Sequence, residues 1–141
     1  MPKFILGLSS INRDSTACLL DQRGNILGAI AEERLTRMKQ QGGLPINAIS
    51  YLKKQFKISN NDIETVTYSF LAADEEKKLA IDALKKDVKS PKRFPLYMKY
   101  LHNYHYKKWT KSTIAGQKRY TDSLLTGLKS IGIKKAVKFF N

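Results

Sequence analysis

The order of short apolar runs in the first 70 residues restricts the fold more than any other feature of the chain. Residues 3–9, 15–20 and 26–31 are three such runs, and Gly24 lies in the turn before the third, where a positive φ is readily adopted. Runs of this length separated by turns predict three strands in an antiparallel meander. Gly7 within the first run indicates a close approach of the backbone to a neighbour.

A helix and a fourth strand follow the meander. Pro45 suits the first position of a helix, and one apolar stripe continues from it at spacings of three to four, at Ile46, Ile49, Leu52 and Phe56. We expect this helix to end near residue 57. Residues 63–70 alternate and are β-branched, which predicts a strand. The pattern to this point is β-β-β-α-β, typical of an α/β domain.

The second half is predicted to be mostly helical, with a last strand at its end. Residues 74–89 and 114–131 have helical patterns, residues 96–109 are aromatic and basic, and Gly132 ends the last helix. Residues 136–140 predict a strand. In a parallel or mixed sheet the loop after such a strand often contributes to the site. We therefore expect residues 1–141 to form one domain that is incomplete at its C-terminus.

Composition restricts the class of protein. The hydrophobic fraction is 42% and the charged fraction 27%, as in an ordinary globular protein. No apolar run approaches the ~20 residues of a membrane span, so no membrane partner is expected. Cys18 is the only cysteine, which excludes an intrachain disulfide and favours a reducing cytoplasm.

The net charge of +14 lies entirely in the second half. Residues 1–76 have nine basic and nine acidic side chains, whereas residues 77–141 have seventeen basic and three acidic ones. Such asymmetry favours an anionic partner. One hypothesis is a non-enzymatic module in which the basic half and its Tyr/Trp residues bind nucleic acid or another anionic partner. The alternative is a lysine-covered, solvated surface without a specific ligand.

Two polar segments are candidates for chemistry. The turn over residues 9–16 concentrates hydroxyls, one acid and one base, ending in Arg13, Asp14, Ser15 and Thr16. Its backbone N–H groups and hydroxyls can meet phosphate oxygens, although the same residues can simply close a hairpin. No residue is identified as catalytic.

The second candidate is the loop over residues 32–45. Arg34, Arg37 and Lys39 suit a phosphate or carboxylate, and Gly42-Gly43 before a helix start would leave N–H groups free to face an anion. The alternative is a solvated loop with local Glu–Arg pairs.

Taken together, these segments resemble the start of the carbamoyltransferase family. The matching runs are Ile5-Leu6-Gly7-Leu8-Ser9, Asp14-Ser15-Thr16-Ala17-Cys18-Leu19-Leu20, Ala31-Glu32-Glu33-Arg34-Leu35-Thr36-Arg37-Met38-Lys39, Leu44-Pro45 and Ala48-Ile49. The family includes nodulation-factor and cephamycin-type enzymes and the tobramycin carbamoyltransferase. An ordered series at family spacing is far more specific than one short motif.

The resemblance implies an actin-like or sugar-kinase-like (ribonuclease H-like) half-domain. It implies that carbamoyl phosphate and ATP form a carbamoyl-adenylate, whose carbamoyl group passes to a small-molecule hydroxyl. On this basis Arg13, Asp14, Ser15 and Thr16 belong to the nucleotide and phosphate turn. The cations that contact carbamoyl phosphate are then Arg34, Arg37 and Lys39. The rest of the enzyme, or a second polypeptide, would complete the site, since this chain alone is expected to be inactive.

The chain departs from the family pattern at two positions. Arg13 stands where the family has a histidine before Asp-Ser, and Gln40 stands where it has a histidine after the lysine. An arginine that is always protonated can hold an anion but cannot perform the acid–base chemistry of histidine. The family also implies a metal ion, iron or another divalent ion, held by a His-rich motif expected beyond Asn141. His102 and His105 supply too few ligands for such a site and are predicted to pack in an aromatic helix.

Overall fold

The computed structural model describes residues 3–9, 13–69, 75, 78, 79, 82, 115, 116 and 118–139. Two compact units divide the chain, one made of Met1–Phe70 and Tyr120–Asn141, the other of Leu71–Arg119. The first unit contains the sheet described below. In the second unit, the described residues 75, 78, 79, 82, 115, 116, 118 and 119 are helical. The predicted aromatic segment at residues 96–109 lies outside the described residues.

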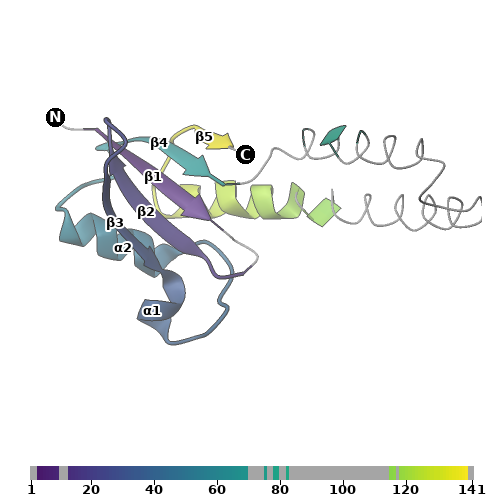
Figure 1. Cartoon of the computed structure of the whole chain (residues 1–141), viewed down its shortest axis with the longest axis horizontal. Coiled ribbons are helices and arrows are strands. Elements are labelled where there is room, and N and C mark those ends of the chain that lie inside the picture. Colours follow the sequence, from purple (N-terminus) through teal and green to yellow (C-terminus); the bar gives the residue numbers. More distant parts are fainter. Residues whose placement is uncertain are drawn as a thin grey trace, which may run out of the picture. The chain divides into compact units, whose positions relative to one another are not determined.

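Within the described residues, seven helices and strands have defined bounds (Figure 1). They are β1 (Phe4–Ser9), β2 (Thr16–Asp21), β3 (Ile26–Ala31), α1 (Glu32–Thr36), α2 (Ile46–Gln55), β4 (Ile63–Tyr68) and β5 (Val137–Phe139). Residues 118–130 are also helical. The four predicted strands of the first 70 residues, the helix after Pro45 and the last strand are therefore confirmed. The short helix α1 is an addition, since it lies in the segment predicted as a loop. Pro45 precedes α2 as its N-cap instead of being its first helical residue, a difference of one position.

The five strands form one mixed sheet in the order β3-β2-β1-β4-β5. The first three strands pair antiparallel, as a meander requires. β4 pairs parallel with β1, and β5 pairs parallel with β4. The connection from β3 to β4 contains α2 and crosses over β2 and β1, so that β4 pairs beside β1; such a crossover is what a parallel pair requires. The fold is therefore of the α/β class, as the sequence predicts.

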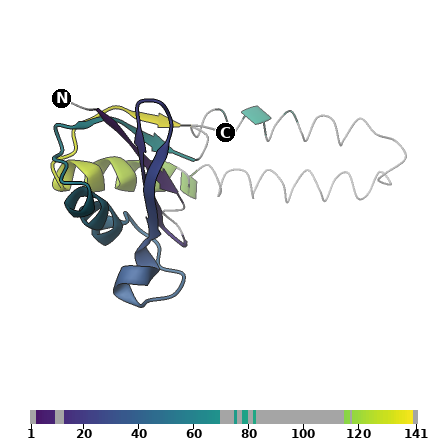
Figure 2. The same ribbon diagram turned by 60° about the vertical axis from the view of Figure 1, so that its left-hand side comes forward.

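Helices cover one face of this sheet. In β1, β2 and β4, buried side chains that point toward the covered face alternate with more exposed ones that point toward the other face. A period of two is expected of strands. Together with α2 and residues 120–133, the buried side chains of these strands form one core, made of Leu6, Leu8, Ala17, Leu19, Ala48, Ile49, Leu52, Ile63, Val66, Tyr68, Leu124, Leu128 and Ile133. Figures 1 and 2 show α2 and the helical residues 120–130 on this same side of the sheet.

Close packing on the covered face depends on two glycines. A Cβ at Gly28 would lie 3.0 Å from Phe56 Cε2 and 3.1 Å from Leu52 Cδ2, while one at Gly127 would lie 3.0 Å from Leu44 Cδ2. Gly7 differs, because a Cβ there would meet only ordinary contacts, 3.5 Å from Thr67 Oγ1. The close approach predicted at Gly7 in β1 is therefore wrong, and Gly28 in β3 has it instead.

Candidate functional site

The polar turn lies between β1 and β2, at the end of the sheet where β1 and its parallel neighbour β4 finish. Ligands of open α/β sheets bind preferentially beyond the carboxyl ends of the strands. Arg13 and Asp14 are exposed there. Asp14 has φ 52°, in the left-handed region that costs a non-glycine residue energy and that is often found at functional sites. Thr16 Oγ1 donates to the carbonyl of Asp14 at 3.1 Å.

Ser15 joins this turn to the segment over residues 32–45, which we call the cationic loop. It is 1% exposed, and both its N–H and its hydroxyl donate to the carbonyl of Gln41, at 3.0 and 3.1 Å. Its own carbonyl accepts from the N–H of Glu32 at 2.9 Å. The structure therefore brings the two predicted segments together. It also commits the Ser15 hydroxyl to an internal bond, which leaves Arg13, Asp14 and Thr16 as the outward members of the turn.

The loop after α1 has an unusual backbone. Arg37, Gln40 and Gly43 have φ values of 63°, 56° and 92°. Glu33 fixes two of these residues, since its carbonyl accepts from Arg37 N at 2.9 Å and its Oε2 accepts from Gln40 N at 3.3 Å. Left-handed residues persist where surrounding contacts hold them in place, and these bonds supply such contacts.

The three cations of residues 32–45 face solvent, with Arg34 in α1 and the other two in the loop after it. Arg34, Arg37 and Lys39 are all exposed. In the described part of the chain, Arg34 forms an ion pair with Glu33, with Nε and Oε1 4.0 Å apart and the Arg34 side chain 77% exposed. A pair this open contributes little stability. The guanidinium of Arg34 thus stays accessible to an external anion.

Glu32 is the residue that sequence reasoning missed. The sequence pattern predicts a solvated position for this residue, but its side chain is buried, with 2% exposed. Its Oε1 accepts from the backbone N and the Nδ2 of Asn47, at 3.1 and 2.7 Å, and its Oε2 accepts from Ala48 N at 2.8 Å. Glu32 therefore satisfies the first-turn donors of α2, which a helix otherwise leaves unpaired. Because the carboxylate comes from fifteen residues upstream, no capping pattern in the sequence reveals it.

This contact corrects one expectation about anion binding. The N-terminus of α2 after Gly42-Gly43 was expected to leave N–H groups free for a ligand. Glu32 already provides a negative charge there, and such a charge interacts favourably with the positive end of the helix dipole. An external anion is therefore better placed among the side-chain cations of the loop than at this helix end.

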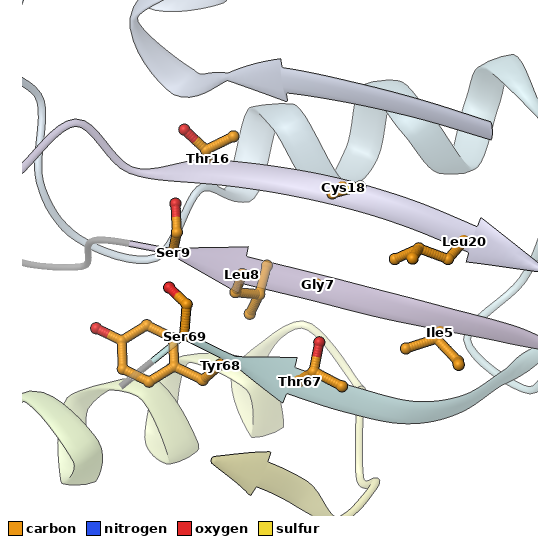
Figure 3. Close-up of a pocket in the computed structure, with 10 residues that line it drawn as sticks. All are labelled: Ile5, Gly7, Leu8, Ser9, Thr16, Cys18, Leu20, Thr67, Tyr68 and Ser69. Carbon is orange, nitrogen blue, oxygen red and sulfur yellow. The ribbon is translucent and has the colours of Figure 1, made fainter. Parts of the chain in front are cut away.

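A hollow of about 450 Å³ lies on the face of the sheet opposite the helices. Figure 3 shows the hydroxyls of Ser9, Thr16 and Ser69 at one end of it, beside the polar turn. The remaining lining is small or apolar, from Ile5, Gly7, Leu8, Cys18, Leu20, Thr67 and Tyr68. Among the described residues, no charged side chain lines it, so this described lining suits uncharged ligand groups and offers no cation to a phosphate.

The described part of the chain has neither a metal-binding cluster nor a helix suited to cross a membrane. Residues 3–9, 13–69 and 118–139, with the isolated described positions, contain no cluster of three His, Cys, Asp or Glu side chains that could hold a metal ion. His102 and His105 lie outside the described residues. Cys18 is half-buried, and burial raises the pKa of its thiol. Among the described helices, none is long and apolar enough to span a membrane.

Comparison with known protein families identifies the family of this chain. Residues 4–138 match the model of the carbamoyltransferase N-terminus. The chain belongs to the carbamoyltransferase family. The match runs from β1 to β5 and includes both the polar turn and the cationic loop. No curated protein matches the chain.

The family assignment supports carbamoyl transfer as the general function. The carbamoyltransferase match extends over the basic half of the chain as far as residue 138. That half is therefore part of the family domain, and nothing found supports the separate nucleic-acid module. The nodulation-factor, cephamycin and tobramycin subtypes remain a prediction from the sequence.

Proposed function

We propose that this carbamoyltransferase domain is the N-terminal part of an ATP-dependent O-carbamoyltransferase. Carbamoyl phosphate and ATP are its substrates. Water cleaves carbamoyl phosphate to carbamate and inorganic phosphate, and the carbamate oxygen attacks the α-phosphorus of ATP and displaces pyrophosphate to give carbamoyl-adenylate. The hydroxyl of a small-molecule acceptor then attacks the carbamoyl carbon, with AMP as the leaving group. The proposal assigns an actin-like fold to the domain and its remaining site to the rest of the enzyme or a second polypeptide. The family match supports the transfer, and the loop geometry supports the anion-binding role.

One observation carries the proposal: the bonds of Ser15 to Gln41 place the polar turn beside the cationic loop. In this arrangement Arg34, Arg37 and Lys39 bind the phosphate of carbamoyl phosphate. A guanidinium offers paired donors to phosphate oxygens, and Lys39 adds a mobile charge. Positioned cations that stabilise developing negative charge are a large part of catalysis in phosphoryl-type chemistry.

The polar turn is assigned to the nucleotide. Arg13 replaces the family histidine and holds an anionic oxygen, while Asp14 and Thr16 present a carboxylate and a hydroxyl at the same edge. Ser15, the fourth member of the predicted set, acts by fixing the turn to Gln41. ATP supplies the adenylyl group when bound. The described residues do not form a donor set for the implied iron or other divalent ion, so no step of the proposal depends on a metal in this chain.

The test is binding of carbamoyl phosphate to the chain, measured by isothermal titration calorimetry. We expect Lys39→Ala to weaken binding about tenfold, because one exposed charge-assisted contact with phosphate contributes roughly 1–2 kcal/mol. Lys54→Ala on α2 is the matched control, since Lys54 is also exposed but lies outside the loop. Equal affinities for the two variants would refute the role of Lys39.

A second measurement addresses ATP dependence in the complete enzyme. Incubation with carbamoyl phosphate, an acceptor and ATP should release pyrophosphate in step with carbamoylated product. Transfer that proceeds at the same rate without ATP would eliminate the carbamoyl-adenylate route while leaving the family assignment intact.

A further inference from the structure

A groove with lysines on its rim lies at the opposite end of the sheet from the polar turn. It occupies about 420 Å³ between the end of the helical residues 118–130 and the start of β5. Its lining is Leu125, Leu128, Lys129, Ile133, Lys134, Lys135 and Ala136, and we call this surface the lysine groove. Because β5 runs parallel to β4 and β1, its start lies at the sheet end away from the candidate site.

The backbone that forms the lysine groove is firmly held. Gly132 has φ 79° and ends the helix in a Schellman motif, in which Ile133 N donates to Leu128 O at 2.9 Å and Gly132 N donates to Lys129 O at 3.0 Å. Asn60 Nδ2 donates to Ile131 O at 2.9 Å and ties this turn to the loop before β4. Little ordering is therefore needed on binding, which favours affinity.

The floor of the groove is apolar. Leu128 and Ile133 are each 2% exposed and belong to the core, so the hollow cannot collapse without disturbing the sheet. Leu125 is 36% exposed at its side. An apolar side chain that entered the hollow would be removed from water against these residues, which is favourable at about 25 cal/mol per Å².

The rim of the groove is cationic. Among the residues that the structure describes, no acidic side chain lines the groove, and none of its three lysines forms an ion pair. Lys129, in the last helical turn, is favoured there by the helix dipole. Lys134 and Lys135 lie beyond the helix end, where the dipole gives no such explanation.

We infer that the lysine groove docks an acidic segment of a partner protein, one with an apolar side chain flanked by Asp or Glu. The apolar residue would enter the hollow and the carboxylates would pair with Lys129, Lys134 and Lys135. Charge complementarity with apolar burial favours this occupant over nucleic acid, whose binding depends mainly on phosphate contacts. The contact holds a partner in place and does not depend on the proposed chemistry.

The test uses the full chain and a fluorescein-labelled peptide in which glutamates flank a central Leu-Phe pair. We expect saturable binding by fluorescence polarisation. The double variant Lys134→Glu/Lys135→Glu should weaken it at least tenfold, because each substitution replaces an attraction by a repulsion. The matched control Lys54→Glu/Lys57→Glu makes the same change of net charge in exposed residues at the end of α2, and should alter affinity less than threefold.

Two further comparisons address the groove itself. Replacing the Leu-Phe pair of the peptide by two serines should weaken binding at least fivefold, and Leu125→Ser in the protein should weaken it about threefold. The inference is overturned by absence of binding, by equal effects of the two lysine pairs, or by a serine peptide that binds as well as the original. Duplex DNA that binds as tightly as the peptide, with equal sensitivity to Lys134→Glu/Lys135→Glu, would also overturn it, since the surface would then be a polyanion patch.

Discussion

The two faces of the sheet are built from the same strands but differ in what covers them. On one face Leu6, Leu19 and Val66 are buried under α2 and the helical residues 120–130. On the other, Ile5, Cys18 and Leu20 are half-buried and line an open hollow. Stability should therefore depend strongly on the first face and weakly on the second, even for residues adjacent in sequence.

The largest expected effect compares two neighbouring leucines of β2. Leu19→Ala removes a fully buried side chain and leaves a cavity, which should lower the free energy of unfolding by about 2–5 kcal/mol. Leu20→Ala removes a half-buried side chain from the open face and should cost less than about 1.5 kcal/mol. Urea denaturation followed by circular dichroism measures both. Equal losses would mean that the open face is as well packed as the covered one.

A buried carboxylate on the helical side provides the second test. Glu32→Ala would leave the N–H groups of Asn47 and Ala48 without their acceptor and should destabilise the fold by about 2–3 kcal/mol. Glu32→Gln keeps one acceptor oxygen and should cost less. Glu33→Ala is a control one position along, where the carboxylate is more exposed. If Glu33→Ala costs as much as Glu32→Ala, the capping of α2 by Glu32 is unimportant.

Two glycines, one on each face of the sheet, test the same difference between the faces with smaller expected changes in stability. Gly28→Ala would place its Cβ 3.0 Å from Phe56 Cε2, and such crowding should cost about 1–2 kcal/mol. Gly7→Ala, facing the hollow, meets ordinary contacts and should be neutral or stabilise the protein by up to about 1 kcal/mol. Thermal unfolding distinguishes them. A marked loss of stability from Gly7→Ala would show that the hollow must stay empty.

The smallest effect concerns Cys18 on the open face. Burial raises the pKa of its thiol, so folding favours the neutral form. This contribution to stability is fully present below the pKa that the thiol has in the unfolded chain. It is lost as the pH rises through the higher pKa of the thiol in the folded protein. Alkylation by iodoacetamide requires the thiolate, and its rate should therefore rise at higher pH than for a cysteine peptide. A rate profile that matches the peptide would contradict the shift.

Local patterns in the sequence predicted most elements of the fold. The period of two in β1, β2 and β4, the apolar stripe of α2 and the glycine at residue 132 all act over a few residues, where sequence and conformation are directly linked. The polar turn and the cationic loop were likewise identified from their side chains and their ordered resemblance to the family. Their mutual contact was not, because Ser15 and Gln41 are far apart in the chain.

The sequence by itself determined which segments become strands and helices, which residues bring charge and hydroxyls, and the family to which they belong. Only the tertiary structure decided that Ser15 is buried against Gln41, that Glu32 caps α2, that Gly28 and not Gly7 is sterically required, and that lysines surround a groove beside β5. The physical reason is one of range. Secondary structure follows local periodicity, whereas burial and hydrogen-bond partners depend on which distant surfaces meet when the sheet and its helices pack together.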